Sequence, residues 1–185
     1  MCLTDLLALI INEITVFSPN FSHIDINRII VSIAFNKRSS RGYIYGKLAP
    51  LCFENGKKEL LRAGRTYRMP EMIENGIRQL YIVYFYAPRF FNLSAKEKLN
   101  VIFHELYHIS PEFNGDIRRM GKKKIAHGHS KKNFDSLFFD EMESFYKHIQ
   151  DTQALDFLSC SMKDFSKKFK TITYSKTKLP KALPV

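Results

Sequence analysis

Residues 94–111 have the sequence SAKEKLNVIFHELYHISP, and this stretch decides how the rest of the chain is interpreted. Ser94 and Glu97 make the pattern of a capping box, in which the serine hydroxyl accepts a first-turn N–H and the glutamate reaches back to the helix start. Apolar residues then recur at helical spacing until Pro111 ends the pattern. We therefore expect a helix that runs from Ser94 to about Ser110.

Within this helix, His104, Glu105 and His108 make the motif HExxH. Two histidines four residues apart lie about 40° apart around a helix, so both imidazoles can bind one ion from the same face. A catalytic zinc site has three protein ligands and a water whose pKa the ion lowers toward ~7. Glu105 lies beside the ligands and can accept the proton of that water. The motif predicts a site for one Zn²⁺ ion with Glu105 as the general base.

The residues alone leave the third ligand open. His127 and His129 follow His108 by 19 and 21 residues, in a loop that can fold back under the motif helix. Glu141 is the alternative, because it falls on the apolar face of a further predicted helix, where an unpaired carboxylate is costly. That carboxylate suits a metal ligand, and better still an acceptor that orients an imidazole N–H. Mn²⁺, Co²⁺ or Fe²⁺ also fits two histidines with a third histidine or carboxylate.

The motif and its surroundings resemble a known family. Residues 103–116 (FHELYHISPEFNGD) and 126–130 (AHGHS) are similar to the phage-type and prokaryotic metallopeptidases, which are zincin-like domains. The resemblance covers most of residues 20–145. It implies an α+β fold with a small mixed sheet, a capped HExxH helix and further C-terminal helices. It also implies a zinc metallopeptidase, whose substrate would be a peptide or protein, but it says little about which one.

The resemblance also bears on the third ligand. In that family a later histidine stands shortly before an aromatic residue that opens the following helix, and His129 stands in this relation to Phe134. The resemblance therefore implies His104, His108 and His129 as the metal ligands. A looser similarity to SprT-like proteases, which act on proteins crosslinked to DNA and have His-Gly after the motif, favours His127 instead.

The remaining elements follow from local patterns. An uninterrupted apolar run predicts a strand covered on both faces, and β-branched residues predict two more strands joined as a hairpin. Apolar residues at helical spacing predict further helices before and after these strands. The predicted strands are residues 28–35, 43–48 and 79–86, with 79–86 the covered one, and the predicted helices are 3–16, 133–149 and 153–169.

The length of 185 residues fits a single domain. We expect this domain to span residues 1–169. Residues 170–185 contain four lysines and two prolines and predict a basic, flexible tail.

Three cysteines without a CxxC pair favour a reduced, cytoplasmic setting. The apolar run near the N-terminus has no basic residue before it and no cleavage site after it, so no signal peptide is predicted. No stretch approaches ~18 uncharged apolar residues, which argues against a membrane partner.

The formal net charge is +11, which favours anionic partners. Basic residues between Arg118 and Lys132 bracket the candidate ligand loop, so nucleic acid or an acidic protein is a candidate partner. Two other functions compete with peptide hydrolysis: hydrolysis of a non-peptide amide, and nucleic-acid binding with a structural zinc. A structural site closes with four protein ligands and needs no base, so Glu105 distinguishes the two kinds of zinc site.

Overall fold

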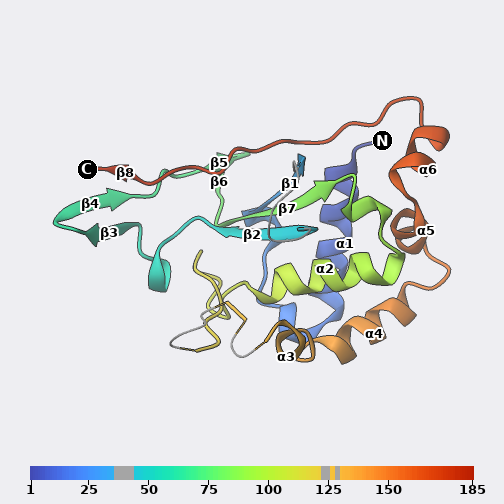
Figure 1. The fold of residues 1–185 in the computed structure, drawn as a ribbon, viewed down its shortest axis with the longest axis horizontal. Helices are drawn as coiled ribbons and strands as arrows, with labels where there is room; N and C mark the ends of the chain where they lie inside the picture. The colour runs from blue at the N-terminus through green and yellow to red at the C-terminus, as the bar shows by residue number, and fades with distance from the viewer. Residues whose placement is uncertain (36–43, 122–125, 128–129) are drawn as a thin grey trace.

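The computed structural model describes residues 1–35, 44–121, 126–127 and 130–185, and Figure 1 shows their arrangement. Helices and short strands alternate irregularly along the chain, which confirms the predicted α+β class. The helices are α1 (Leu3–Phe17), α2 (Ala95–Tyr107), α3 (Lys131–Asp135), α4 (Phe139–His148), α5 (Gln153–Ser159) and α6 (Met162–Lys168). The strands are β1 (Ile29–Phe35), β2 (Gly46–Pro50), β3 (Glu59–Arg62), β4 (Arg65–Arg68), β5 (Ile73–Glu74), β6 (Ile77–Arg78), β7 (Tyr81–Ala87) and β8 (Leu183–Pro184).

The central sheet has the strand order β1, β7, β2. Strand β7 runs parallel to β1 and antiparallel to β2, so the sheet is mixed, as predicted. The predicted hairpin between residues 28–35 and 43–48 is wrong, because β7 lies between the two strands. Almost every side chain of β7 is buried, and a central position removes more of this apolar surface from water than an edge position does.

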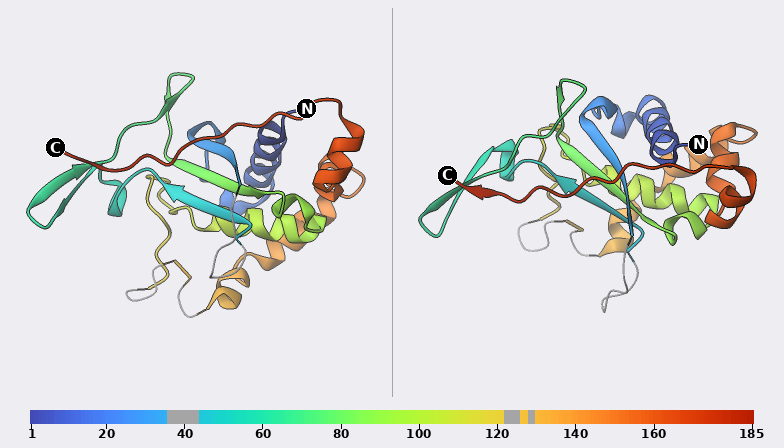
Figure 2. Two further views of the ribbon diagram at one scale, coloured as in Figure 1. Left: turned by 45° about the horizontal axis from the view of Figure 1, so that its top comes forward. Right: turned by 90° about the horizontal axis from the view of Figure 1, so that it is seen from above.

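Different parts of the chain cover the two faces of this sheet. Val31, Val83 and Phe85 point to one face and pack in the main core, which includes residues of α1 and α2. Figure 2 shows the course of these two helices beside the sheet. Ile82 and Tyr84 point to the opposite face and belong to a smaller apolar cluster. This alternation with a period of two is what a strand buried on both sides requires. Helix α2 lies under the sheet, against the edge strand β2.

Helix α2 carries the HExxH motif, and it begins as predicted. The Ser94 hydroxyl accepts a hydrogen bond from Glu97 N–H, and the Glu97 carboxylate accepts one from Ser94 N–H at 2.9 Å. The helix ends at Tyr107, a few residues earlier than predicted. Just past this end, the His108 carbonyl leaves the helical pattern and accepts the N–H of Arg118 at 2.7 Å. The two motif histidines therefore lie at the C-terminal end of α2.

Both long helices predicted in the C-terminal part are divided. Residues 133–149 are found in α3 and α4, and residues 153–169 in α5 and α6. The apolar spacing continues across the first break, since Phe134 and Phe138 are both buried, and the second break coincides with a new N-cap at Ser161. In the described part of the chain, no helix has both the length and the apolar character that a membrane span needs.

Residues 170–185, where a flexible tail was predicted, lie extended along the sheet (Figure 1). On the side of β1 away from β7, Ile33 N–H donates to the carbonyl of Ser175 at 3.0 Å, and Thr177 N–H donates to the Ser32 hydroxyl at 2.9 Å. Strand β8 then pairs with β4. These contacts shield the edge of β1, which would otherwise present unpaired backbone groups. The domain boundary at residue 169 stays a prediction.

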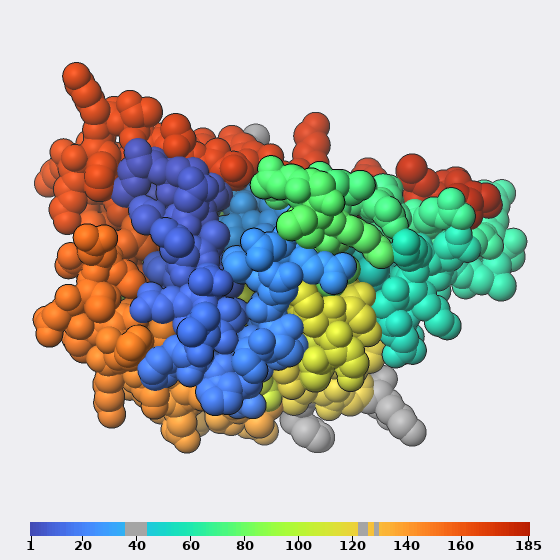
Figure 3. All heavy atoms as spheres, turned by 180° about the vertical axis from the view of Figure 1, so that it is seen from behind, coloured from blue at the N-terminus to red at the C-terminus, as the bar shows by residue number. Residues whose placement is uncertain are grey.

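A small sheet of β3, β4 and β8 projects from one end of the molecule. The view from behind shows the projection beside the body, with the C-terminal segment running along its upper side (Figure 3). Its side chains are largely exposed, as the burial of β3 and β4 shows. This part of the chain had no predicted structure, because its pattern is neither clearly helical nor clearly alternating.

Lys98 is a buried cation on α2, only 1% exposed. Its ammonium donates hydrogen bonds to the carbonyls of Leu158 (2.6 Å) and Cys160 (2.7 Å), at the C-terminal end of α5. A cation in this position satisfies unpaired carbonyls and complements the negative end of the helix dipole. Burial nevertheless lowers the pKa of Lys98 from 10.5 to about 8.

We expect the protein to gain stability relative to a Lys98→Met variant as pH rises from about 8 to about 10. In that range the unfolded chain keeps the proton on Lys98 and the folded protein releases it, so the unfolded state binds more protons and stability rises with pH. The difference between the pKa values of Lys98 in the unfolded and folded states corresponds to about 3 kcal/mol in the free energy of unfolding. Urea unfolding of the metal-free proteins at several pH values measures this gain. If the free energy of unfolding changes equally with pH in the wild type and in Lys98→Met, the expectation is wrong.

Candidate metal centre

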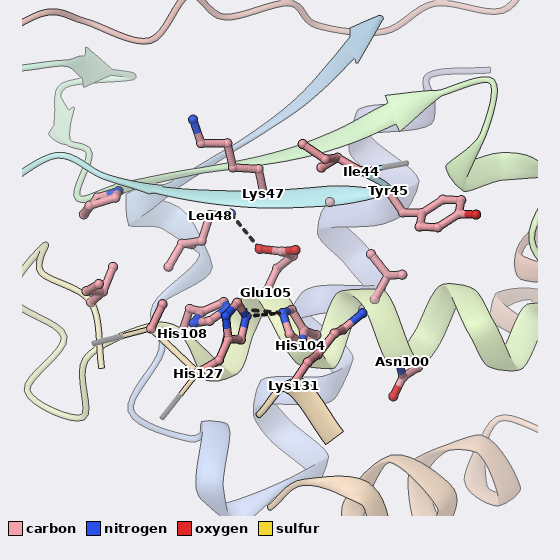
Figure 4. A pocket seen from close by; sticks show the side chains of 15 residues that line it. Ile44, Tyr45, Lys47, Leu48, Asn100, His104, Glu105, His108, His127 and Lys131 are labelled. Atoms are coloured by element: carbon pink, nitrogen blue, oxygen red, sulfur yellow. Dashed lines mark hydrogen bonds between the residues drawn. The ribbon is translucent and has the colours of Figure 1, made fainter. Parts of the chain in front are cut away.

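Three histidine side chains converge beside the sheet (Figure 4). His104 Nε2 lies 3.2 Å from His108 Nε2 and 3.1 Å from His127 Nε2. The candidate ligand atoms all lie within 4.8 Å of one another. A tetrahedral zinc ion with Zn–N bonds of ~2.0–2.1 Å would hold its nitrogen ligands about 3.3 Å apart. The arrangement therefore fits three imidazoles around one ion.

The protonation of the three imidazoles also suits metal binding. Burial is the main cause that lowers the pKa of each of them, and for His108 burial and the neighbouring His104 lower the pKa to about 3. At neutral pH the rings are therefore uncharged and each offers a nitrogen lone pair. A metal site requires this state, because a protonated imidazole cannot be a ligand.

Asp135 orients the first of these ligands. Its Oδ1 lies 2.6 Å from Nδ1 of His104, so the Nδ1 proton is held by the carboxylate and Nε2 is left free to accept a metal. Sequence reasoning gave this kind of role to Glu141 and missed Asp135. No local pattern in the sequence marks Asp135, which follows Phe134, whose ring stacks on His108 with centroids 4.5 Å apart. Glu141 instead accepts a hydrogen bond from Asn20 at 2.7 Å.

An Asp135→Asn variant is expected to bind zinc ~10- to 100-fold more weakly than the wild type. The amide has the shape of the carboxylate but lacks the charge that fixes the His104 tautomer and makes its ring more basic. Competition with a fluorescent zinc chelator measures the affinity. Asp140→Asn is the matched control, because Asp140 lies exposed on α4, outside the three-histidine cluster. Unchanged zinc affinity in Asp135→Asn would remove this residue from the site.

The predicted ligands are thus placed as follows. His104 and His108 come together from α2, and His127 joins them from the loop before α3. His129, implied by the family resemblance, lies outside the described residues, so its role stays a prediction. Of the other histidines, His148 lies 3.8 Å from Glu13 and stacks on the ring of Phe17, away from the cluster.

Glu105 lies next to the histidines and is held by the sheet. It is 7% exposed, and its Oε2 accepts the backbone N–H of Leu48 on β2 at 2.7 Å. Burial raises the pKa of Glu105 to about 7, against the opposing effect of the Leu48 hydrogen bond. The carboxyl group is therefore balanced between its two protonation states near neutral pH, as a general acid–base group should be. Its Oε1 has no hydrogen-bond partner among the described residues and remains available for a water.

Gly46 allows β2 to approach this carboxylate. A Cβ atom at Gly46 would lie 2.8 Å from Cγ and 2.9 Å from Oε1 of Glu105, and 2.9 Å from Cγ1 of Val101. Real Cβ atoms essentially never come so close to other atoms. Only glycine therefore permits the present spacing of β2 and α2. Sequence analysis did not identify Gly46, because nothing local marks a contact with a residue so distant in the chain.

With Glu105 as the predicted general base, a Gly46→Ala variant is expected to lose ~100-fold in kcat, since a misplacement of about 1 Å can cost this much. The added methyl group must push Glu105 and β2 apart, and the Leu48 hydrogen bond lengthens. Peptide hydrolysis by the zinc-loaded variant, together with its thermal unfolding, separates a displaced carboxylate from a misfolded protein. Gly64→Ala is the control for folding, because a Cβ there meets no atom within 4 Å although its φ of +72° adds local strain. A Gly46→Ala variant with full activity would show that the close approach is unnecessary.

The histidines and Glu105 line a cavity of about 480 Å³ between β2 and α2. Just after β2, a loop covers the outer edge of the chain, where Cys52 N–H donates to the carbonyl of Gly115 at 2.9 Å. A further strand cannot pair there. Tyr81 holds that loop in place: its hydroxyl accepts the N–H of Gly115 and donates to the carbonyl of Asp116, both at 2.9 Å. The part of β2 that faces the cavity is therefore short and begins at Gly46 among the described residues.

Comparison with known proteins identifies a family. The chain matches the model of a family described as "putative phage metallopeptidase" over residues 3–170. No curated protein and no solved structure gives a significant match. The family implies a bound metal, and the three-histidine cluster is a place for one. Because the match spans nearly the whole sequence, the chain belongs to this family of phage metallopeptidases.

Proposed function

We propose that the protein is a zinc-dependent peptidase in which His104, His108 and His127 hold one Zn²⁺ ion and Glu105 is the general base. The convergence of three neutral imidazoles beside a buried carboxylate is the observation that carries this proposal. His127 takes the place of His129 in the proposed ligand set, because His127 Nε2 lies 3.1 Å from His104 Nε2. Zinc is the favoured ion for three nitrogen ligands. A zincin-like relationship is part of the proposal.

The roles of the residues follow from their positions. Zinc, when bound, supplies a Lewis acid that acidifies water and polarises the scissile carbonyl. Oε1 of Glu105 accepts the proton of the attacking water, while Oε2 stays on the Leu48 N–H and keeps the carboxylate aimed. Glu105 then returns the proton to the leaving amine. The His104–Asp135 contact keeps the first ligand in the correct tautomer.

Strand β2 is the proposed support for the substrate. Among the described residues it is an edge strand of its sheet, and its outer side faces the cavity. An extended peptide can add to such an edge as a further strand. Strand β7 is central in the sheet, so β2 takes this role on the side of the cavity. Because Leu48 N–H is bound by Glu105, the peptide would use Gly46 and the Leu48 carbonyl.

The site favours catalysis over a structural zinc. A structural site closes with four protein ligands, whereas the described residues provide three, and these open into a cavity. The nucleic-acid partner predicted from charge has little support in the contacts near the site. Arg118 lies over the Tyr107 ring at 4.2 Å, and Arg119 pairs with Asp116. A cytoplasmic setting stays part of the proposal, supported by three free cysteines.

Metal removal tests the proposed function. We expect the protein purified without chelators to contain about one zinc per chain and to cleave members of a mixed peptide library. Dialysis against a strong chelator should abolish cleavage, and stoichiometric zinc should restore it. A library of non-peptide amides, assayed in parallel, separates a peptidase from the other amide hydrolases. Zinc-loaded protein that cleaves neither library would overturn the proposal.

A further inference from the structure

Lys131 is a cation at the cleft that the proposed mechanism does not use. It is the first residue of α3, which starts at the N-cap Ser130, and its side chain is exposed. Figure 4 shows it beside His104, on the side away from His108. Within the part of the chain that the structure describes, its ammonium makes no ion pair. The positive charge is therefore available to a ligand in the cleft.

Three cavities meet at this residue, two of them along α2 and a third, of about 590 Å³, on the side of α3 and α4. Lys131 lines the cavity of about 480 Å³ that contains the histidines, and it also lines a neighbouring one of about 400 Å³. Tyr45, Asn100 and Val101 line both cavities as well. The second cavity continues the cleft along α2 toward its N-terminus. A substrate that extends past His104 in this direction must pass the Lys131 side chain.

The direction of the substrate follows from strand β2. A peptide that adds to β2 in the antiparallel sense, which gives the more stable pairing, has its C-terminal part near Tyr45 and its N-terminal part near Pro50. Lys131 and Asn100 lie toward the Tyr45 end of the cleft. The ammonium therefore faces the residues that follow the scissile bond.

The neighbouring carboxylates do not neutralise Lys131. The Asp135 carboxylate contacts Nδ1 of His104, and that of Glu97 accepts hydrogen bonds from Ser94 at the start of α2. Lys96, at the far end of the second cavity, pairs with Glu143 at 2.6 Å. Glu105 lines the first cavity with Lys131, and Asp135 and Asp140 line the third, but among the residues described none of them forms an ion pair with the Lys131 ammonium.

The charge of Lys131 determines which ligand groups it can bind. Asn100 and Tyr45 line both cavities along α2 together with Lys131. Lysine ammonium donates hydrogen bonds and carries a positive charge, so it suits a carboxylate, which accepts hydrogen bonds only. An apolar or cationic side chain gains no such contact.

We propose that Lys131 selects peptides with a carboxylate on the C-terminal side of the scissile bond. This inference rests on the proposed peptidase function. The carboxylate belongs either to an aspartate or glutamate side chain or to the C-terminus of the peptide. Because the ammonium is exposed, its effect is moderate: changing Asp to Asn in the substrate lowers kcat/KM ~five-fold at low salt. The preference weakens at about 0.5 M salt, where charges are screened over short distances.

The test maps cleavage sites in a peptide library by mass spectrometry, followed by matched peptides that carry Asp, Asn or Lys after the scissile bond. The wild type should prefer Asp, Lys131→Gln should lose the preference, and Lys131→Glu should prefer Lys. Lys132→Gln is the matched control, since it removes the same charge from the next residue, which lines neither of the two cavities along α2. Amidated peptides distinguish a side-chain carboxylate from a terminal one. An equal preference for Asp in the wild type and in Lys131→Gln overturns the inference.

A binding experiment separates this inference from the proposed function. The zinc-loaded Glu105→Gln protein is titrated with the Asp and Asn peptides, and fluorescence anisotropy gives the two Kd values. A tighter Asp complex that depends on Lys131 supports the carboxylate site even if the wild type cleaves no peptide, in which case the proposed function alone fails. Equal Kd values for the two peptides overturn the carboxylate site, whether or not peptides are cleaved.

Discussion

Replacing Glu105 by glutamine is expected to lower kcat for peptide hydrolysis by about 10³-fold, within the range that general bases contribute. The amide oxygen of glutamine can still accept the Leu48 N–H, so the side chain should stay in place. It cannot accept a proton from water. Zinc content should be unchanged, because Glu105 is not among the three clustered ligands. Steady-state kinetics and elemental analysis on the same protein sample measure both quantities.

A glutamate elsewhere provides the control for this variant. Glu59 is largely exposed on β3 and pairs with Arg68, away from the cleft. Glu59→Gln should therefore retain the wild-type kcat. If Glu105→Gln keeps more than about a tenth of the activity, a contribution below the usual range for a general base, another group must accept the proton.

Replacing His127 by alanine is expected to remove zinc from the protein. The variant keeps two of the three converging imidazoles, and the site loses the ligand that the loop before α3 supplies. The loss of affinity should exceed the ~10- to 100-fold that follows from removing an outer partner of a ligand. Dialysis against a weak chelator, followed by elemental analysis, should leave zinc on the wild type and little on the variant.

The same measurement on His129→Ala decides between the two histidines of the loop. We expect this variant to retain its zinc, since His127 is the residue whose Nε2 lies 3.1 Å from that of His104. The opposite result, with zinc lost from His129→Ala and retained by His127→Ala, would restore the ligand that the family resemblance implies. It would assign His127 to an outer role. Loss of zinc from both variants would mean that the loop supplies two ligands.

The features predicted correctly are those that depend on short spacings. The Ser94–Glu97 cap and the pair of histidines follow from helix geometry alone, because residues three and four apart share a face. The buried strand β7 follows from its uninterrupted apolar run. Each of these predictions used residues within one element, where backbone geometry leaves little freedom.

The features that were missed depend on contacts between distant segments. Asp135 reaches His104 across 31 positions, and the Leu48 N–H reaches Glu105 across 57. No local pattern identifies such pairs. The hairpin was wrong for the same reason, since its two strands look adjacent in sequence and β7 enters between them from farther along the chain. Gly46 belongs to this group, because its role is defined by a neighbour on α2.

In the proposed mechanism, the hydrogen bond from Leu48 to Glu105 means that one strand would both hold the substrate and aim the carboxylate. A displacement of β2 on peptide binding would therefore also displace the carboxylate of Glu105. Substitutions in β2 should therefore change kcat and KM together. Redesign of substrate preference should leave β2 alone and alter Lys131, which borders the cleft without a hydrogen bond to Glu105.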